Sequence, residues 1–122
     1  MVDDHDIFRS TMRSQLASYR DLEVIGEVSN GAEAIELVGR LRPTVVLMDI
    51  HLGRMMDGIA ATRVLATLYP DVAVLGLSWD TKEYVVSAMH QAGALDVLVK
   101  GQTADEVHRA ILRAVASMSD EL

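Results

Sequence analysis

The sequence contains no cysteine, and among its 122 residues only two are proline, one is tryptophan and one is phenylalanine. The lack of cysteine excludes a disulfide framework, a thiolate zinc site and a cysteine nucleophile. Apolar runs such as Val45–Met48 are far shorter than the roughly 20 residues of a membrane-spanning helix. No basic segment followed by an apolar one opens the chain, as a secretory signal would require. We therefore expect a cytoplasmic protein without a membrane segment.

Positive charge is also scarce, because 11 Lys and Arg stand against 18 Asp and Glu and leave a net charge of −7. A surface this acidic repels nucleic acid phosphates and anionic lipid headgroups, so DNA or membrane binding by the chain itself is not expected. Apolar residues are abundant at 50%, which is enough for one core of ordinary size. The length predicts a single domain over residues 1–122.

Short runs rich in Val, Ile and Leu alternate with longer amphipathic segments. The short runs have little polar alternation, which is typical of strands buried on both faces, and predict strands at Glu23–Val28, Thr44–Met48, Val72–Leu77 and Leu95–Val99. Apolar residues near helical spacing predict helices at Asp6–Ser18, Gly31–Leu41, Asp57–Leu68, Lys82–Ala92 and Ala104–Met118. This alternation indicates an α/β fold with a parallel sheet. Only Met1 and Val2 are available for a strand before the first helix.

Polar residues follow the predicted strands at the ends where open parallel sheets bind ligands. Asp3 and Asp4 follow the first two residues, while Asp49, Ser78 and Lys100 each follow an apolar run directly. Carboxylates held close together raise each other's pKa, and a hard divalent cation such as Mg²⁺ relieves that repulsion. One carboxylate can then act as a nucleophile and become an aspartyl phosphate. A lysine and a hydroxyl are suited to hold the phosphoryl group.

These residues also carry a family resemblance. Four stretches of the sequence resemble the receiver domain of two-component response regulators in their order and approximate spacing. They are Val2–His5, Leu47–Ile50, Leu75–Ser78, and Gly93–Ala94 followed by Lys100. The resemblance covers the whole chain and implies a flavodoxin-like, doubly wound parallel sheet of five strands, order 2-1-3-4-5, with five helices. The opening stretch and Lys100–Glu106 resemble the subfamily that usually carries a LuxR-type helix-turn-helix output domain. That output domain is absent from this chain, so DNA contact is expected only through it.

The resemblance implies roles for three of these residues. Asp49 would accept a phosphoryl group from a sensor histidine kinase or a phosphotransfer protein. Ser78 would be the switch hydroxyl, and Lys100 the lysine that pairs with the phosphate. The domain would then switch its protein-interaction surface, with a homodimer as a possible outcome. Such a module is a signalling domain and not an enzyme in its own right.

The same resemblance implies a magnesium site. Asp4, Asp49 and the backbone carbonyl of His51 would hold Mg²⁺, and Asp3 would act mainly through water. The side chain of His51 is expected in solvent. A zinc site is not expected, because the histidines at 5, 51, 90 and 108 form no i,i+4 pair and no convergent motif.

The sequence departs from the family pattern at several positions. Gly53 stands where proline is usual, Met56–Gly58 comes one residue late, Val97 replaces the usual switch aromatic, and Trp79 replaces a small residue. Val97 has no ring to turn, which predicts a switch without the usual aromatic rotation, and Trp79 is either a lid over the site or a surface aromatic. Because the first strand is nearly absent, we expect residues before Met1, or a partner chain, to complete it.

Two other functions share parts of this pattern. A phosphatase of the haloacid dehalogenase type also places a nucleophilic Asp after a parallel strand, but it needs a second Asp two positions later, where this chain has His51. A pseudo-receiver would keep the fold and act by protein binding without phosphorylation. The full set of acids, hydroxyl and lysine argues against a pseudo-receiver, whereas Val97 and the short first strand favour it. A nucleotide-binding domain is excluded, because neither Gly-x-Gly-x-x-Gly nor a P-loop motif occurs.

Overall fold

From residue 31 onwards, helices and strands alternate along the chain as the sequence predicts. The computed structural model describes residues 1–52, 57–79 and 82–120. Its elements are α1 (Asp6–Leu16), α2 (Gly31–Leu41), β1 (Val45–Asp49), α3 (Gly58–Leu68), β2 (Ala73–Ser78), α4 (Glu83–Ala92), β3 (Asp96–Val99) and α5 (Ala104–Asp120). Every predicted helix is present, and the ends differ from the predicted ones by no more than two residues.

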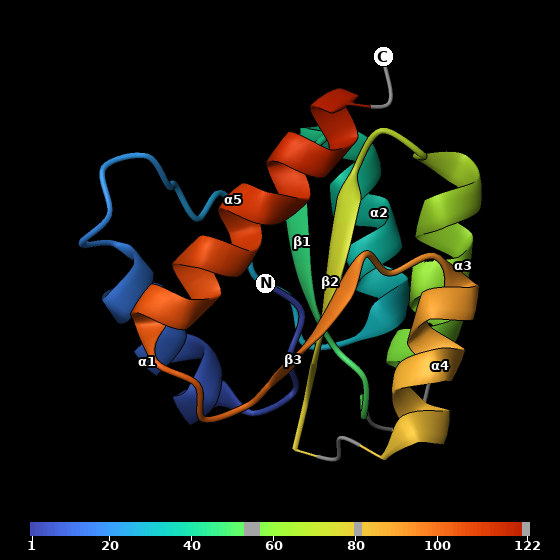
Figure 1. The fold of residues 1–122 in the computed structure, drawn as a ribbon, viewed down its shortest axis with the longest axis horizontal. Helices are drawn as coiled ribbons and strands as arrows, with labels where there is room; N and C mark the ends of the chain where they lie inside the picture. The colour runs from blue at the N-terminus through green and yellow to red at the C-terminus, as the bar shows by residue number, and fades with distance from the viewer. Residues whose placement is uncertain (53–56, 80–81, 121–122) are drawn as a thin grey trace.

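The sheet is parallel and lies between two layers of helices (Figure 1). Its strand order is β1-β2-β3, with Val45 paired to Ala73 and Leu75 paired to Asp96. Helices α2, α3 and α4 cover one face, where Met48 and Leu65 are fully buried, and α1 and α5 cover the other, where Leu75 is fully buried. The apolar runs of β1 and β2 are therefore buried from both sides, which explains their lack of polar alternation.

The predicted strand at Glu23–Val28 is wrong, and the predicted order of five strands is not confirmed. Within the described ranges the sheet has three strands, and residues 23–27 have no regular secondary structure. Val2 forms isolated parallel bridges to Val28 on one side and to Met48 on the other. A strand requires a ladder of pairs with a neighbour, and among residues 23–28 only Val28 is bridged, to Val2.

Local capping sets where the helices begin and end. The side chain of Asn30 accepts a hydrogen bond of 2.9 Å from the backbone N–H of Glu33 at the start of α2. Asp57 caps α3 in the same way through the N–H of Ala60, at 2.8 Å. Gly93 ends α4 with a φ of +119°, a conformation that favours glycine. Within the described part of the chain, none of the helices combines the length and apolar character needed to cross a bilayer.

Candidate functional site

The parallel strands bring the predicted site residues to one edge of the sheet. β1 ends at Asp49, β2 ends at Ser78, and Lys100 directly follows β3. Asp3 joins them because the neighbouring Val2 is bridged to Met48 of β1. The residues Asp3, Asp49, Ser78 and Lys100 are each no more than 3% exposed. Four separate segments of the chain thus build one buried polar cluster at the position that the sequence predicts.

Lys100 is the positive centre of this cluster. Its Nζ lies 2.8 Å from Oδ2 of Asp3 and 3.2 Å from Oδ2 of Asp49. The backbone N–H of Lys100 donates to the carbonyl of Ser78 at 2.9 Å, which ties the end of β3 to the end of β2. A buried ammonium is tolerated only when it is paired, and here two carboxylates share that task.

Asp49 is held in a state that favours protonation. Burial, and next the charge of Asp3, raise its pKa from 3.8 to about 6, although Lys100 acts in the opposite direction. The backbone N–H of His51 donates to Oδ1 of Asp49 at 3.2 Å, which orients the carboxylate. The ionised form therefore lacks full compensation, and an added positive charge would stabilise it.

The donor set suits a hard cation. Ligand atoms of Asp3, Asp4, His5 and Asp49 all lie within 4.8 Å of one another. Among the described residues, the buried Oδ2 atoms of Asp3 and Asp49 accept no hydrogen bond and are compensated only by the Lys100 ion pairs. Clustered carboxylate oxygens are suited to a hard cation such as Mg²⁺, which prefers oxygen ligands. His51 is exposed, as expected, and its carbonyl as a ligand stays a prediction.

His5 and Phe8 belong to the site although sequence reasoning did not place them there. Nδ1 of His5 lies 3.3 Å from Asp3 and 3.1 Å from Asp4, and its backbone N–H donates to Asp3 at 2.8 Å. The ring centroid of Phe8 lies 4.7 Å from the Lys100 ammonium, a cation–π contact. The sequence feature that could have placed them there is the predicted start of α1 at Asp6, which brings the first turn of this helix next to the acids.

Trp79 is a surface aromatic, which is one of the two predicted alternatives, and it contacts Phe8 beside the site. It is 65% exposed, and its ring packs edge-on against Phe8 at a centroid distance of 6.3 Å. Gly101 has a φ of +103°, and a Cβ built there would lie 3.4 Å from the Trp79 ring. Phe8 thus connects the buried Lys100 to an exposed indole.

Gly53 and Met56, two of the positions that depart from the family pattern, follow β1 in the sequence. Both lie outside the described ranges. Gly58, the last residue of that motif, is described. A Cβ built on Gly58 would lie 2.0 Å from the backbone oxygen of Asp49, so only glycine fits there. The start of α3 is therefore packed directly against the backbone of the candidate nucleophile.

Comparison with known proteins shows the family of this chain. The family model "Response regulator receiver domain" matches residues 1–112. The transcriptional regulatory protein DegU of Brevibacillus brevis is 38% identical over 111 residues, which cover 91% of this chain and 47% of that protein. LiaR of Bacillus subtilis is 36% identical over 114 residues, covering 93% of this chain and 54% of LiaR. The chain thus spans about half the length of these curated relatives.

Solved structures agree with the sequence matches. The receiver domain of NarL from Mycobacterium tuberculosis superimposes with a TM-score of 0.89 at 30% identity, covering 94% of this chain and 92% of that domain. The response regulator domain of CheB from Thermotoga maritima gives a TM-score of 0.86 at 26% identity, covering 94% and 92%. Three findings lead to one conclusion: helices on both faces of a parallel sheet, an acid and lysine cluster at its carboxyl edge, and these matches. The chain belongs to the response regulator receiver domain family of two-component signalling.

Proposed function

We propose that this domain accepts a phosphoryl group on Asp49 and that phosphorylation changes its protein-interaction surface. The observation that carries the proposal is the buried Asp49 carboxylate, 3.2 Å from the Lys100 ammonium and beside the other acids. The proposed donor is a sensor histidine kinase or a phosphotransfer protein, by similarity to the relatives. In a longer protein, the domain would control an output domain, as the names of the transcriptional regulators suggest.

The proposed transfer uses few groups. An oxygen of Asp49 attacks the phosphorus of the donor, an O–P bond forms, and the N–P bond of a phosphohistidine breaks, leaving the imidazole to take up a proton. Lys100 then faces the added negative charge, and the hydroxyl of Ser78, at the end of the adjacent β2, is proposed to donate to a phosphoryl oxygen. Positioning and charge neutralisation are the main requirements of this chemistry.

Mg²⁺ is the proposed cofactor. Asp4 and Asp49 would hold it together with the carbonyl of His51, and Asp3 would act through water. When bound, it supplies positive charge that offsets the phosphoryl oxygens and the acid cluster. Asp3 is already committed to Lys100 at 2.8 Å, which supports an indirect role, whereas the Asp4 side chain is one-third exposed and can reorient.

The test is incubation of the chain with acetyl phosphate and Mg²⁺, followed by intact-mass measurement. We expect a gain of one phosphoryl group that disappears in Asp49→Asn and on chelation of the metal. Asp57→Asn is the matched control, because an asparagine still caps α3 and Asp57 is exposed. Its labelling should equal that of the unchanged chain.

Three outcomes would contradict the proposal in different ways. Undiminished labelling in Asp49→Asn would move the phosphorylation site elsewhere. Labelling that persists after Mg²⁺ is removed would exclude the proposed cofactor. A folded domain that neither acetyl phosphate nor any phosphorylated kinase labels would be a pseudo-receiver acting by binding alone.

A further inference from the structure

The ammonium of Lys100 contacts an aromatic ring as well as two carboxylates. The Lys100 side chain is 1% exposed, and its Nζ lies 2.8 Å from Oδ2 of Asp3 and 3.2 Å from Oδ2 of Asp49. The centroid of the Phe8 ring lies 4.7 Å from the same nitrogen. A cation–π attraction is stronger where the cation is shielded from water, so the ring face of Phe8 contributes to holding this ammonium in place.

The same ring contacts a side chain at the surface. The centroids of Phe8 and Trp79 lie 6.3 Å apart, and the two ring planes meet at 69°. An edge-on arrangement at this distance is one of the favourable geometries of an aromatic pair. Trp79 directly follows Ser78 at the end of β2 and is 65% exposed, so its indole has room to change its surroundings. Phe8 is therefore placed between a buried charge and a surface that another protein can contact.

The backbone beneath these rings is held in place. Arg9, the residue after Phe8 in α1, donates from Nη1 to the carbonyl of Asp3, and its Nε lies 3.3 Å from Oε1 of Glu27. These contacts fix the first turn of α1 to the segment that carries the acids. A displacement of the Lys100 ammonium is thus expected to change the ring pair and not the position of the helix.

We propose that Phe8 is a positioning residue that couples the Lys100 ammonium to Trp79, so that a charge added at Asp49 changes the exposed indole. This inference rests on the proposed phosphorylation of Asp49. A phosphoryl group offers the ammonium more acceptors and more negative charge than the carboxylate alone. As Lys100 turns toward it, its contact with the ring face of Phe8 weakens, and the edge contact with Trp79 readjusts.

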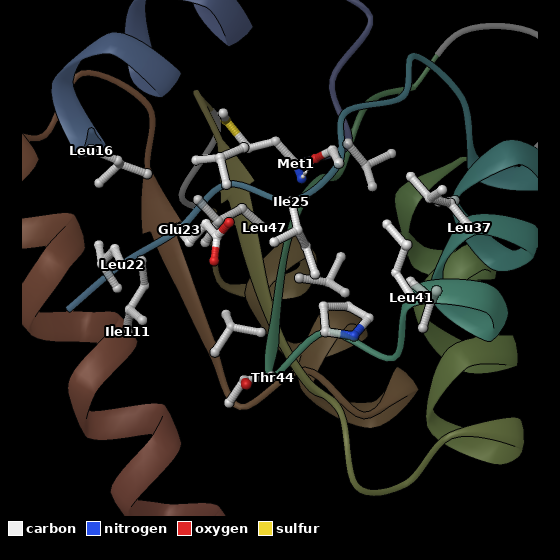
Figure 2. A pocket seen from close by; sticks show the side chains of 18 of the residues that line it. Met1, Leu16, Leu22, Glu23, Ile25, Leu37, Leu41, Thr44, Leu47 and Ile111 are labelled. Atoms are coloured by element: carbon white, nitrogen blue, oxygen red, sulfur yellow. Dashed lines mark hydrogen bonds between the residues drawn. The ribbon is translucent and has the colours of Figure 1, made fainter. Parts of the chain in front are cut away.

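The large apolar pocket beside β1 is not part of this connection. It encloses about 520 Å³, and Figure 2 shows Leu37 and Leu41 of α2 along one wall and Leu16 and Ile111 along the other. The described residues that line it do not include Phe8, Trp79 or Lys100. Leu41→Ala removes apolar contacts in this pocket, and the variant therefore serves as a control for general loosening of the domain.

The first experiment needs no phosphoryl group. Trp79 is the only tryptophan of the chain, so its emission reports its surroundings without a label. Lys100→Met removes the charge and should shift this emission when Phe8 is present, but should leave it nearly unchanged in Phe8→Leu. Phe8→Tyr keeps the ring face and should restore the shift. Near-UV circular dichroism establishes that each variant is folded, and Lys100→Gln replaces Lys100→Met if the latter is not.

The second experiment adds beryllofluoride and Mg²⁺, and ¹⁹F NMR measures how much of the protein is occupied. Per occupied site, the emission change of Trp79 should be retained in Phe8→Tyr and in the Leu41→Ala control, and mostly lost in Phe8→Leu. Coupling between two sites is reciprocal, so Trp79→Leu should alter the beryllofluoride affinity by at least about fivefold when Phe8 is present. In Phe8→Leu the same substitution should leave that affinity unchanged.

The two experiments distinguish failure of this inference from failure of the proposed function. An equal emission shift by Lys100→Met with and without the Phe8 ring would overturn the coupling and assign it to the backbone from Ser78 to Trp79. Loss of the beryllofluoride response in Leu41→Ala as well would overturn it in favour of general loosening. If the unchanged chain does not bind beryllofluoride but the Lys100→Met shift still requires the ring, the coupling is supported and the proposed phosphorylation is contradicted.

Discussion

Replacing Asp49 by Asn should stabilise the metal-free domain at neutral pH, although it removes one partner of a buried lysine. The pKa of Asp49 is raised from 3.8 to about 6, chiefly by burial and then by Asp3. Between these two pH values the folded state binds more protons than the unfolded state, so the free energy of unfolding falls as the pH rises through this window. An amide of the same shape carries no charge and avoids that loss.

The magnitude follows from the shift. A rise from 3.8 to about 6 corresponds to about 3 kcal/mol at pH 7.5, where Asp49 is ionised in both states. The attraction of Lys100 at 3.2 Å is already included in this net shift, and Lys100 keeps its other partner, Asp3, at 2.8 Å. We therefore expect Asp49→Asn to be more stable by about 3 kcal/mol at pH 7.5, or roughly 10 °C in Tm. At pH 4, where the native carboxyl is protonated, the gain should vanish.

The assay is urea unfolding of both proteins in chelator from pH 4 to pH 7.5. The unchanged chain should lose stability over this range relative to Asp49→Asn, and saturating Mg²⁺ at pH 7.5 should restore stability only to the unchanged chain. A variant that is less stable at pH 7.5, or a stability difference that does not depend on pH, would refute the electrostatic description of the site.

The remaining predictions concern the residues around Asp49. Asp4→Ala should abolish stabilisation by Mg²⁺ while changing the metal-free stability by no more than about 0.5 kcal/mol. Asp3→Ala should lower the stability by about 3 kcal/mol, because it removes the 2.8 Å partner of a buried ammonium. Urea titration of the two variants measures both differences. Gly58→Ala should cost at least about 2 kcal/mol, since its Cβ would lie 2.0 Å from the Asp49 carbonyl, and a neutral result would disprove that close approach. The emission of Trp79 should change when beryllofluoride and Mg²⁺ are added and stay constant in Asp49→Asn; an unchanged spectrum in a demonstrably modified protein would remove Trp79 from the switch.

Residues at strand ends were the most predictable part of the site. Parallel strands end at a common edge, so the order of apolar runs and following polar residues was enough to bring Asp49 and Lys100 together. The contact of Phe8 with Lys100 was not predictable, because helical spacing alone gives the face of a helix and not the residue it meets. His5 was missed for a related reason, since its backbone N–H donates to Asp3 only through a local turn.

The segment Glu23–Val28 shows the limit of composition as a guide to strands. Its Val and Ile residues favour extended backbone, but a strand also requires a neighbour along its whole length, and only Val28 has one. Hydrophobic patterning therefore identified a segment that lies at the edge of the sheet without identifying its pairing.

The acid and lysine cluster draws on residues from nearly the whole sequence, and this has a consequence for the timing of assembly. Asp3 is synthesised before Lys100, which follows only after β1, β2 and β3 have been synthesised. At translation rates of about 5–20 residues per second, the acids spend several seconds without their positive partner. A nascent chain thus carries the carboxylates before the complete acid and lysine cluster can form. Local unfolding of β3 in the finished protein would likewise separate Lys100 from the carboxylates. The site can therefore act only when the whole sheet, including β3, is folded.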